Sequence, residues 1–132
     1  MAKRKSIGSG RPSEAMMGYC RALRFDNPSS LICFSGTAST NPDGSVYAVG
    51  DPAAQTTHIL EMMKETLQKL GASMEDVVRT RIFVVDILDN WEAVGKAHGE
   101  FFGEIRPATT MVGTSGLVHP DMLVEIDADA VI

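Results

Sequence analysis

The last strand-like segment of the chain, residues 123–132, constrains the fold more than any other stretch. Its apolar and acidic residues alternate strictly, and a side-chain period of two is typical of a half-buried β-strand. One face carries small and β-branched side chains, namely Val124, Ile126, Ala128, Ala130 and Ile132. The other face carries three carboxylates, Glu125, Asp127 and Asp129, between Leu123 and Val131. The first face predicts a packed core, and the second calls for partners of opposite charge.

A second strong strand is predicted over residues 77–85 (VVRTRIFVV), where two arginines alternate with apolar residues. Arg79 and Arg81 share a face with Val77, Phe83 and Val85. If this strand neighbours the last one, its arginines pair with Asp127 and Asp129 across the strands. A face with paired charges and apolar residues favours a subunit interface, and therefore a homo-oligomer. The alternative is a set of solvent-exposed ion pairs that contribute little to stability.

The remaining segments complete an α+β pattern. Strands are predicted over 18–25 and 31–35, as a hairpin around the turn-rich 26–30, with a short edge strand over 46–49. A helix begins at Asp51-Pro52 and ends at Gly71, and a second begins at Asp86 or Asp89 and ends at Gly103. Two closing strands joined by a turn occupy 106–132. The order ββ(β)αβαββ predicts a mixed sheet with both helices on one face.

Length and composition restrict the class of protein. The 132 residues suit one domain, spanning 1–132, in which 1–13 form a tail or an irregular leading segment. The net charge of −5 argues against nucleic-acid binding, and the only basic run, 3–5, is interpreted as a solvated tail. No membrane span or secretion signal is evident, which indicates a cytoplasmic protein without a membrane partner. Cys20 and Cys33 are expected to be buried, reduced thiols.

Few side chains are candidates for chemistry. Glu125 is the best acid or base, because a carboxylate in a partly buried cleft has a perturbed pKa. Its alternative role is a salt bridge to an arginine of the middle strand. Tyr19 is placed on a strand where its hydroxyl reaches a cleft or simply packs. The three histidines, His58, His98 and His119, have no metal-site spacing and are interpreted as structural or surface residues, and no zinc or other metal site is predicted.

Eight short motifs stand in an order that resembles the RidA (YjgF) family of imine deaminases, also labelled L-PSP endoribonucleases. They are Gly18-Tyr19, Ser35-Gly36-Thr37, Ala54-Gln55, Leu70-Gly71-Ala72, Val84-Val85-Asp86, Glu100-Phe101-Phe102, Arg106-Pro107-Ala108 and Val124-Glu125-Ile126-Asp127-Ala128. The resemblance covers about residues 15–132. It implies a chorismate-mutase-like fold and a homotrimer that binds small molecules in clefts between subunits. It further implies hydrolysis of enamines and imines such as 2-aminoacrylate, with no metal or organic cofactor, and a cleft containing Glu125, Tyr19, Ser35 and Gly36.

The chain departs from this family at one position. Active members carry an arginine directly after the Pro-Ala pair that clamps the substrate carboxylate, whereas Pro107-Ala108 is followed here by two threonines. Counting back from Glu125 selects Thr110, and counting forward from the Pro-Ala pair selects Thr109. Arg106 precedes the proline and shares strand parity with Thr110, so it is retained as a candidate substrate-binding residue.

Two functions remain after this comparison. The first is hydrolysis of a non-standard imine or enamine, other than 2-aminoacrylate, with Glu125 positioning water while Thr110 and Ser35 hold the substrate. The second is a non-catalytic trimer that binds or senses a small ligand. Ribonuclease action fits poorly with the acidic charge.

Overall fold

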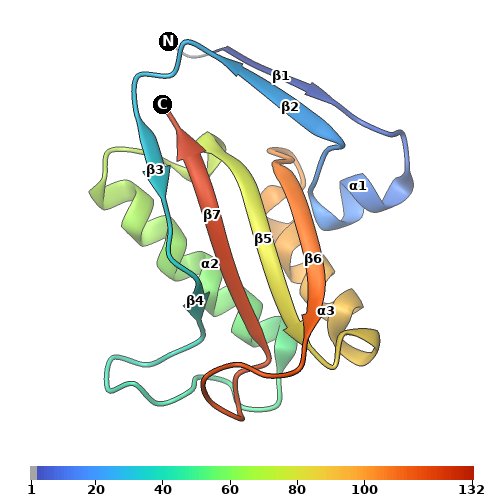
Figure 1. The fold of residues 1–132 in the computed structure, drawn as a ribbon, viewed down its shortest axis with the longest axis vertical. Coiled ribbons are helices and arrows are strands. Elements are labelled where there is room, and N and C mark those ends of the chain that lie inside the picture. The colour runs from blue at the N-terminus through green and yellow to red at the C-terminus, as the bar shows by residue number, and fades with distance from the viewer. Residues whose placement is uncertain (1–2) are drawn as a thin grey trace.

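Strand β7 (Val124–Val131) lies inside the main sheet of the computed structural model, which describes residues 3–132. The strand order is β3-β7-β5-β6, and the short β4 also pairs with β7. Strand β5 (Val77–Val85) runs antiparallel to β7 and parallel to β6 (Ala108–Thr114). Helices α2 (Pro52–Lys69) and α3 (Ile87–Phe102) pack side by side behind this sheet (Figure 1). The predicted mixed sheet with both long helices on one face is therefore confirmed.

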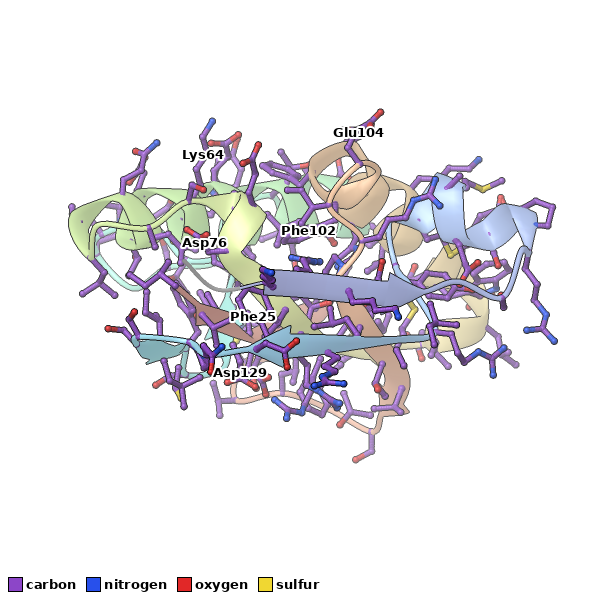
Figure 2. All side chains as sticks on the ribbon, turned by 90° about the horizontal axis from the view of Figure 1, so that it is seen from above. Phe25, Lys64, Asp76, Phe102, Glu104 and Asp129 are labelled. Carbon is purple, nitrogen blue, oxygen red and sulfur yellow. The ribbon has the colours of Figure 1, made fainter. Side chains whose placement is uncertain are left out.

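The apolar face of β7 forms the centre of the core, as its alternation predicts. Four of its side chains are fully buried: Val124, Ile126, Ala128 and Ala130. They pack with Ile82 and Val84 of β5 and with the inner faces of both helices, where Phe102 fills the space above the sheet. Figure 2 shows the two layers, with Phe102 between them and Asp129 directed to the opposite side. Burial of this apolar surface is the main term that stabilises the domain.

A β-bulge in β5 corrects one sequence-based assignment. The pairing with β7 shifts between Val77 and Arg79, so that Val77 turns into the core and is fully buried. Beyond the bulge, Thr80, Ile82 and Val84 face the helices. Arg79 and Arg81 keep the opposite face, as predicted, but they do not share it with Val77. An extra residue in a strand breaks the two-residue period, and the sequence pattern alone does not reveal it.

The two long helices follow their predicted boundaries. The Asp51 carboxylate accepts the backbone N–H of Ala54 at 3.0 Å and caps α2, and Gly71 takes the left-handed conformation just beyond it. Helix α3 buries Val94, Ala97, His98 and Phe102, whereas Trp91 on the same helix stays 39% exposed. A further short helix, α1 (Pro12–Met17), packs on α3 at Gly99, where the Met16 carbonyl leaves no room for a side chain.

The N-terminal quarter differs most from prediction. Strand β1 (Lys3–Ile7) pairs with β2 (Ala22–Asp26) in a separate two-stranded sheet above the main one (Figure 1). Residues 3–7 are thus a strand, and the helix over 12–17 begins inside the segment 1–13, where the sequence indicated a tail or an irregular segment. Strand β3 (Leu31–Cys33) pairs with β7, so the predicted hairpin between β2 and β3 is wrong. Strands β1 and β2 pair through their backbones, but apolar residues do not alternate in β1. The sequence therefore contains no periodic signal for that strand.

Two smaller pairings also differ. Residues 46–49 form no strand; Val46 makes only an isolated bridge to Thr40, and β4 is instead Thr37–Ala38. Strands β6 and β7 do not pair with each other, because β5 lies between them. A 3₁₀ turn, Met74–Asp76, leads into β5. Both cysteines are free, with Cys20 buried as expected and Cys33 exposed, contrary to expectation. No helix within residues 3–132 has the length and apolar character to cross a membrane, and the cytoplasmic location stays a prediction.

Arg4 joins the two-stranded sheet to the rest of the domain. Its guanidinium donates to the carbonyl oxygens of Val77 at 2.9 Å, Glu75 at 3.1 Å and Ile105 at 2.8 Å. These carbonyls lie at the start of β5 and at the end of α3, more than 70 residues away along the chain. Because the planar fork of arginine suits several acceptors at once, Arg4 is anchored rather than solvated, whereas its neighbours Lys3 and Lys5 are exposed as the solvated interpretation of the run predicted.

We expect Arg4→Ala to lower the free energy of unfolding by about 1–3 kcal/mol, because carbonyls that accept from a charged donor lose it. Urea unfolding at constant pH measures this loss. Lys5→Ala is the matched control, since Lys5 is an exposed cation on the same strand. Equal effects of the two substitutions would contradict an anchoring role for Arg4.

His98 is the only histidine held in the core of the described residues. It is 1% exposed, and its Nδ1 lies 2.6 Å from the Met17 carbonyl while its Nε2 lies 3.0 Å from Thr80 Oγ1. Burial lowers the pKa of His98 to about 4, because the charged ring would lose its hydration. The structural role predicted for His98 is thus supported by its surroundings.

The lowered pKa of His98 predicts a pH-dependent stability. Between pH 6.5 and about 4 the unfolded ring binds a proton that the folded ring does not, so stability is complete above 6.5 and falls as the pH drops through this window. The loss attributable to His98 approaches about 3 kcal/mol. Urea midpoints between pH 4 and 7 measure it, and His98→Gln should show a shallower slope. Identical slopes in the two proteins would contradict this prediction.

Candidate functional site

The Glu125 carboxylate lies on the sheet face opposite the helices, hereafter the open face. It is partly buried, and it has no hydrogen-bond or salt-bridge partner within residues 3–132. The strand register explains this, because Phe83 is the β5 residue opposite Glu125 and Arg81 is opposite Asp127. Arg81 therefore binds Asp127 at 2.9 Å and Asp129 at 3.4 Å. The alternative role predicted for Glu125, a salt bridge to a middle-strand arginine, is absent from the described chain.

Gly36 lies directly beside Glu125, and Ser35 is its neighbour along the chain. They precede β4, whose Ala38 pairs with Glu125 on β7. A Cβ atom added at Gly36 would lie 2.7 Å from Glu125 Oε2, so a residue with a side chain would push the carboxylate away. Three of the predicted site residues are thus brought together at one corner of the open face.

Tyr19 lies at a different place, in a cavity of about 300 Å³ on the helix side of β6. It follows α1 rather than lying on a strand, and its hydroxyl is 2.7 Å from Ser13 Oγ. The cavity is lined by Met17, Tyr19, Ile82, Gly95, His98, Thr109 and Met111. Because Ile82 faces the helices and Glu125 faces away from them, one copy of the chain does not direct Tyr19 and Glu125 at the same point.

The two threonines after Pro107-Ala108 point to opposite sides of β6. Thr110 is paired with Arg81 of β5 and is exposed on the open face. Thr109 is paired with Thr80 and lines the cavity that contains Tyr19. Counting forward from the Pro-Ala pair thus selects the threonine that shares a cavity with Tyr19, and counting back from Glu125 selects the other.

Arg106 lies in the segment between α3 and β6, and it is not among the residues that line the cavity. Its Nε donates to the Gly103 carbonyl at 2.9 Å, and its backbone has a positive φ of 53°. The pKa of Glu14 is lowered mainly because the Ser9 backbone N–H donates to its carboxylate. The charge of Arg106 adds to this lowering. These contacts give Arg106 a structural role, and its binding of substrate stays a prediction.

Sequence reasoning missed the polar residues behind the cavity. Thr109 Oγ1 is 2.8 Å from Thr80 Oγ1, which in turn is 3.0 Å from His98 Nε2. Thr80 and His98 are both buried. Their positions on β5 and α3 are far apart in sequence, and only the packing of α3 against the sheet joins them.

The open face combines paired charges with exposed apolar side chains. The hydrogen bond that Arg81 donates to the Asp127 carboxylate raises the pKa of Arg81 above its usual value. Arg79 forms no ion pair within residues 3–132, so the predicted pairing is confirmed for Arg81 only. Leu31 is 66% exposed and Val112 42% exposed on this face. Among the described residues, no three His, Cys, Asp or Glu side chains are grouped as a metal site.

Known proteins resemble this chain over nearly its whole length. The sequence model of the Endoribonuclease L-PSP family matches residues 10–132. The 3-aminoacrylate deaminase RutC of Acinetobacter baylyi is 37% identical over 126 residues, which cover 96% of this chain and 95% of that protein.

Two solved structures share the fold. The Rid-family protein YyfB of Yersinia pestis has a TM-score of 0.86 at 29% identity, with 98% of each chain covered. Rv2704 of Mycobacterium tuberculosis, a YjgF/YER057c/UK114 family member, has a TM-score of 0.69 at 41% identity and covers 98% of this chain and 100% of its own. The predicted chorismate-mutase-like α+β fold is confirmed. The chain therefore belongs to the Endoribonuclease L-PSP family, which is the RidA/YjgF family that its motifs resemble.

Proposed function

We propose that this protein hydrolyses a small imine or enamine in clefts between the subunits of a homotrimer. The observation that carries the proposal is the Glu125 carboxylate, partly buried beside Gly36 and without a partner in residues 3–132. Such a carboxylate can accept a proton from water and return it, as hydrolysis of a C=N bond requires. The similarity to a 3-aminoacrylate deaminase supports the same class of reaction.

The reaction consumes one water molecule and leaves the oxidation state of the substrate unchanged. An enamine first takes a proton on carbon and gives up one from nitrogen, which makes it an imine. Glu125 then accepts a proton from water while the water oxygen bonds to the imine carbon, and the imine nitrogen takes a proton from solvent. Glu125 returns its proton to the amine nitrogen of this carbinolamine, the C–N bond breaks, ammonia leaves with the bonding electron pair, and loss of the hydroxyl proton to solvent leaves a carbonyl product.

The substrate is a molecule other than 2-aminoacrylate. Neither Thr109 nor Thr110 can make the bidentate, charged contact by which the family arginine holds a carboxylate. A hydrogen bond to a charged group is worth about 1.5–3 kcal/mol, so its loss weakens carboxylate binding substantially. A carboxylate-free imine avoids this loss.

The placement of the site residues supports assembly. Tyr19 and Thr109 lie on the helix side of β6, and Glu125 lies on the open face, so a ligand that contacts both groups needs two copies of the chain. The open face also has the composition of an interface, with exposed Leu31 and Val112 around a paired arginine.

We expect the wild-type protein to accelerate ammonia release from a carboxylate-free aldimine formed in situ by an amine oxidase. It should leave the decay of 2-aminoacrylate, formed in situ by a serine dehydratase, at the buffer rate. Glu125→Gln should abolish the acceleration, because an amide cannot take the proton from water.

Asp129→Asn is the matched control, since it makes the same carboxylate-to-amide change four residues away on the same face. It should retain turnover. Fast hydrolysis of 2-aminoacrylate would contradict the proposed substrate class, and full activity of Glu125→Gln would contradict the assigned base. Ligand binding without turnover of either imine would instead support the non-catalytic trimer, which the missing arginine favours.

We expect light scattering at micromolar concentration to give three times the 14.2 kDa chain mass. Val112→Glu should lower this mass, because it buries an unpaired charge in the proposed interface. Leu70→Glu is the control: Leu70 is 54% exposed, beyond the end of α2 in the helix layer. A monomeric wild-type mass, or equal masses for both variants, would contradict an interface on the open face.

A further inference from the structure

A chain of three hydrogen-bonding side chains runs from the core to the cavity. His98 Nδ1 lies 2.6 Å from the Met17 carbonyl, and His98 Nε2 lies 3.0 Å from Thr80 Oγ1. Thr80 Oγ1 is then 2.8 Å from Thr109 Oγ1, and Thr109 lines the cavity. The two distances at Thr80 are typical of hydrogen bonds, and the distance from His98 Nδ1 to the carbonyl is short for one.

The groups at the two ends of this series of hydrogen bonds decide which atom donates in each one. A carbonyl oxygen only accepts, so His98 Nδ1 carries a proton and donates it to Met17. Burial keeps the ring neutral at pH 7, with a pKa of about 4, so Nε2 is bare and accepts. Thr80 must therefore donate its single hydroxyl proton to Nε2. Its oxygen can then only accept, and the proton between the two threonines comes from Thr109.

One other contact of Thr109 competes for the same proton. Its Oγ1 also lies 3.3 Å from the Pro107 carbonyl. This distance is long for a hydroxyl donor, whereas 2.8 Å to Thr80 is typical. Donation to Pro107 would moreover leave no proton between two threonine oxygens 2.8 Å apart. The Thr109 proton therefore points at Thr80, and only the lone pairs of Thr109 are available to a ligand in the cavity.

The other residues that line the cavity supply no positive charge. Met17, Ile82, Gly95 and Met111 are apolar, the Tyr19 hydroxyl is bound to Ser13, and His98 is neutral. An anion placed against Thr109 would meet oxygen lone pairs in partly apolar surroundings, which is unfavourable. A ligand with an N–H group would satisfy them.

We propose that Thr109, oriented by Thr80 and His98, is the specificity-determining residue of this cavity and accepts a hydrogen bond from the N–H group of a small, carboxylate-free ligand. This inference rests on the proposed function for the ligand's identity, since protonated imines and enamines both carry such an N–H group. Thr80 and His98 act as positioning residues, because they fix the direction of the Thr109 proton without reaching the ligand.

Two ligands of the same shape test this selection. Isobutyramide has two N–H donors, and isobutyrate replaces them with a negative charge. NMR titration of the wild-type protein should show that signals of the cavity residues shift at about three- to tenfold lower concentration with the amide, as one neutral hydrogen bond implies. Thr109→Val should remove the preference, and Thr109→Ser should keep it. Thr109→Arg should reverse it in favour of isobutyrate.

The direction of the hydrogen bonds from Thr109 through Thr80 to His98 can be measured separately. At pH 7 the ¹⁵N shifts of His98 should show a protonated Nδ1 and a bare Nε2, and Thr80→Val should move the Nε2 signal and weaken the amide preference. Thr80→Ser is the control for folding, because it retains the hydroxyl. Thr80 is fully buried, so a Thr80→Val protein that fails to fold leaves the three Thr109 variants as the deciding comparison.

These binding measurements need no turnover, so the inference and the proposed function fail separately. Absence of imine hydrolysis together with an amide preference would overturn only the catalytic proposal. Equal or tighter binding of isobutyrate by the wild-type protein, no binding of either probe in the cavity, or an unchanged preference in Thr109→Val would each overturn the role of Thr109.

Discussion

The register between β5 and β7 is the constraint on which both the core and the site depend. It sets Ile82 beside Ile126 and Val84 beside Val124 on the helix face, and Arg81 beside Asp127 on the other. A slip of two residues would keep every side chain on its face but would set Arg81 opposite Glu125. The Glu125 carboxylate would then form an ion pair with Arg81. The observed register instead leaves Phe83 opposite Glu125 and keeps that carboxylate available.

The parts of the fold with a strong period could be predicted from the sequence. Strand β7 and helices α2 and α3 bury one face each, so their apolar residues recur at the spacing of the element. The bulge at Val77 was missed because a single extra residue leaves no repeat to detect. The sheet formed by β1 and β2 was missed for a different reason: it is held by backbone pairing and by the three carbonyl contacts of Arg4, and neither has a periodic signature.

Part of the candidate site was predicted from the sequence. There is a physical reason why the other part was not. The grouping of Ser35, Gly36 and Glu125 was indicated by ordered motifs, and β4 brings these residues together. The choice between Thr109 and Thr110 stayed open because successive residues of a strand point to opposite faces, so an uncertainty of one residue decides which face is meant. The roles of Thr80 and His98 depend on the packing of α3 against β5, and no spacing in the sequence encodes that contact.

The replacement of arginine by threonine changes more than one contact. Thr109 is tied through Thr80 to a histidine that is 1% exposed, so its hydroxyl is part of the core hydrogen bonding as well as part of the cavity wall. An arginine in its place would remove the hydroxyl that donates to Thr80 Oγ1 and would bring a charge to the edge of an apolar cavity. Buried polar groups that lose a partner are costly. The surrounding residues are therefore matched to threonine, which is the arrangement expected if the cavity has been shaped for a ligand without a carboxylate.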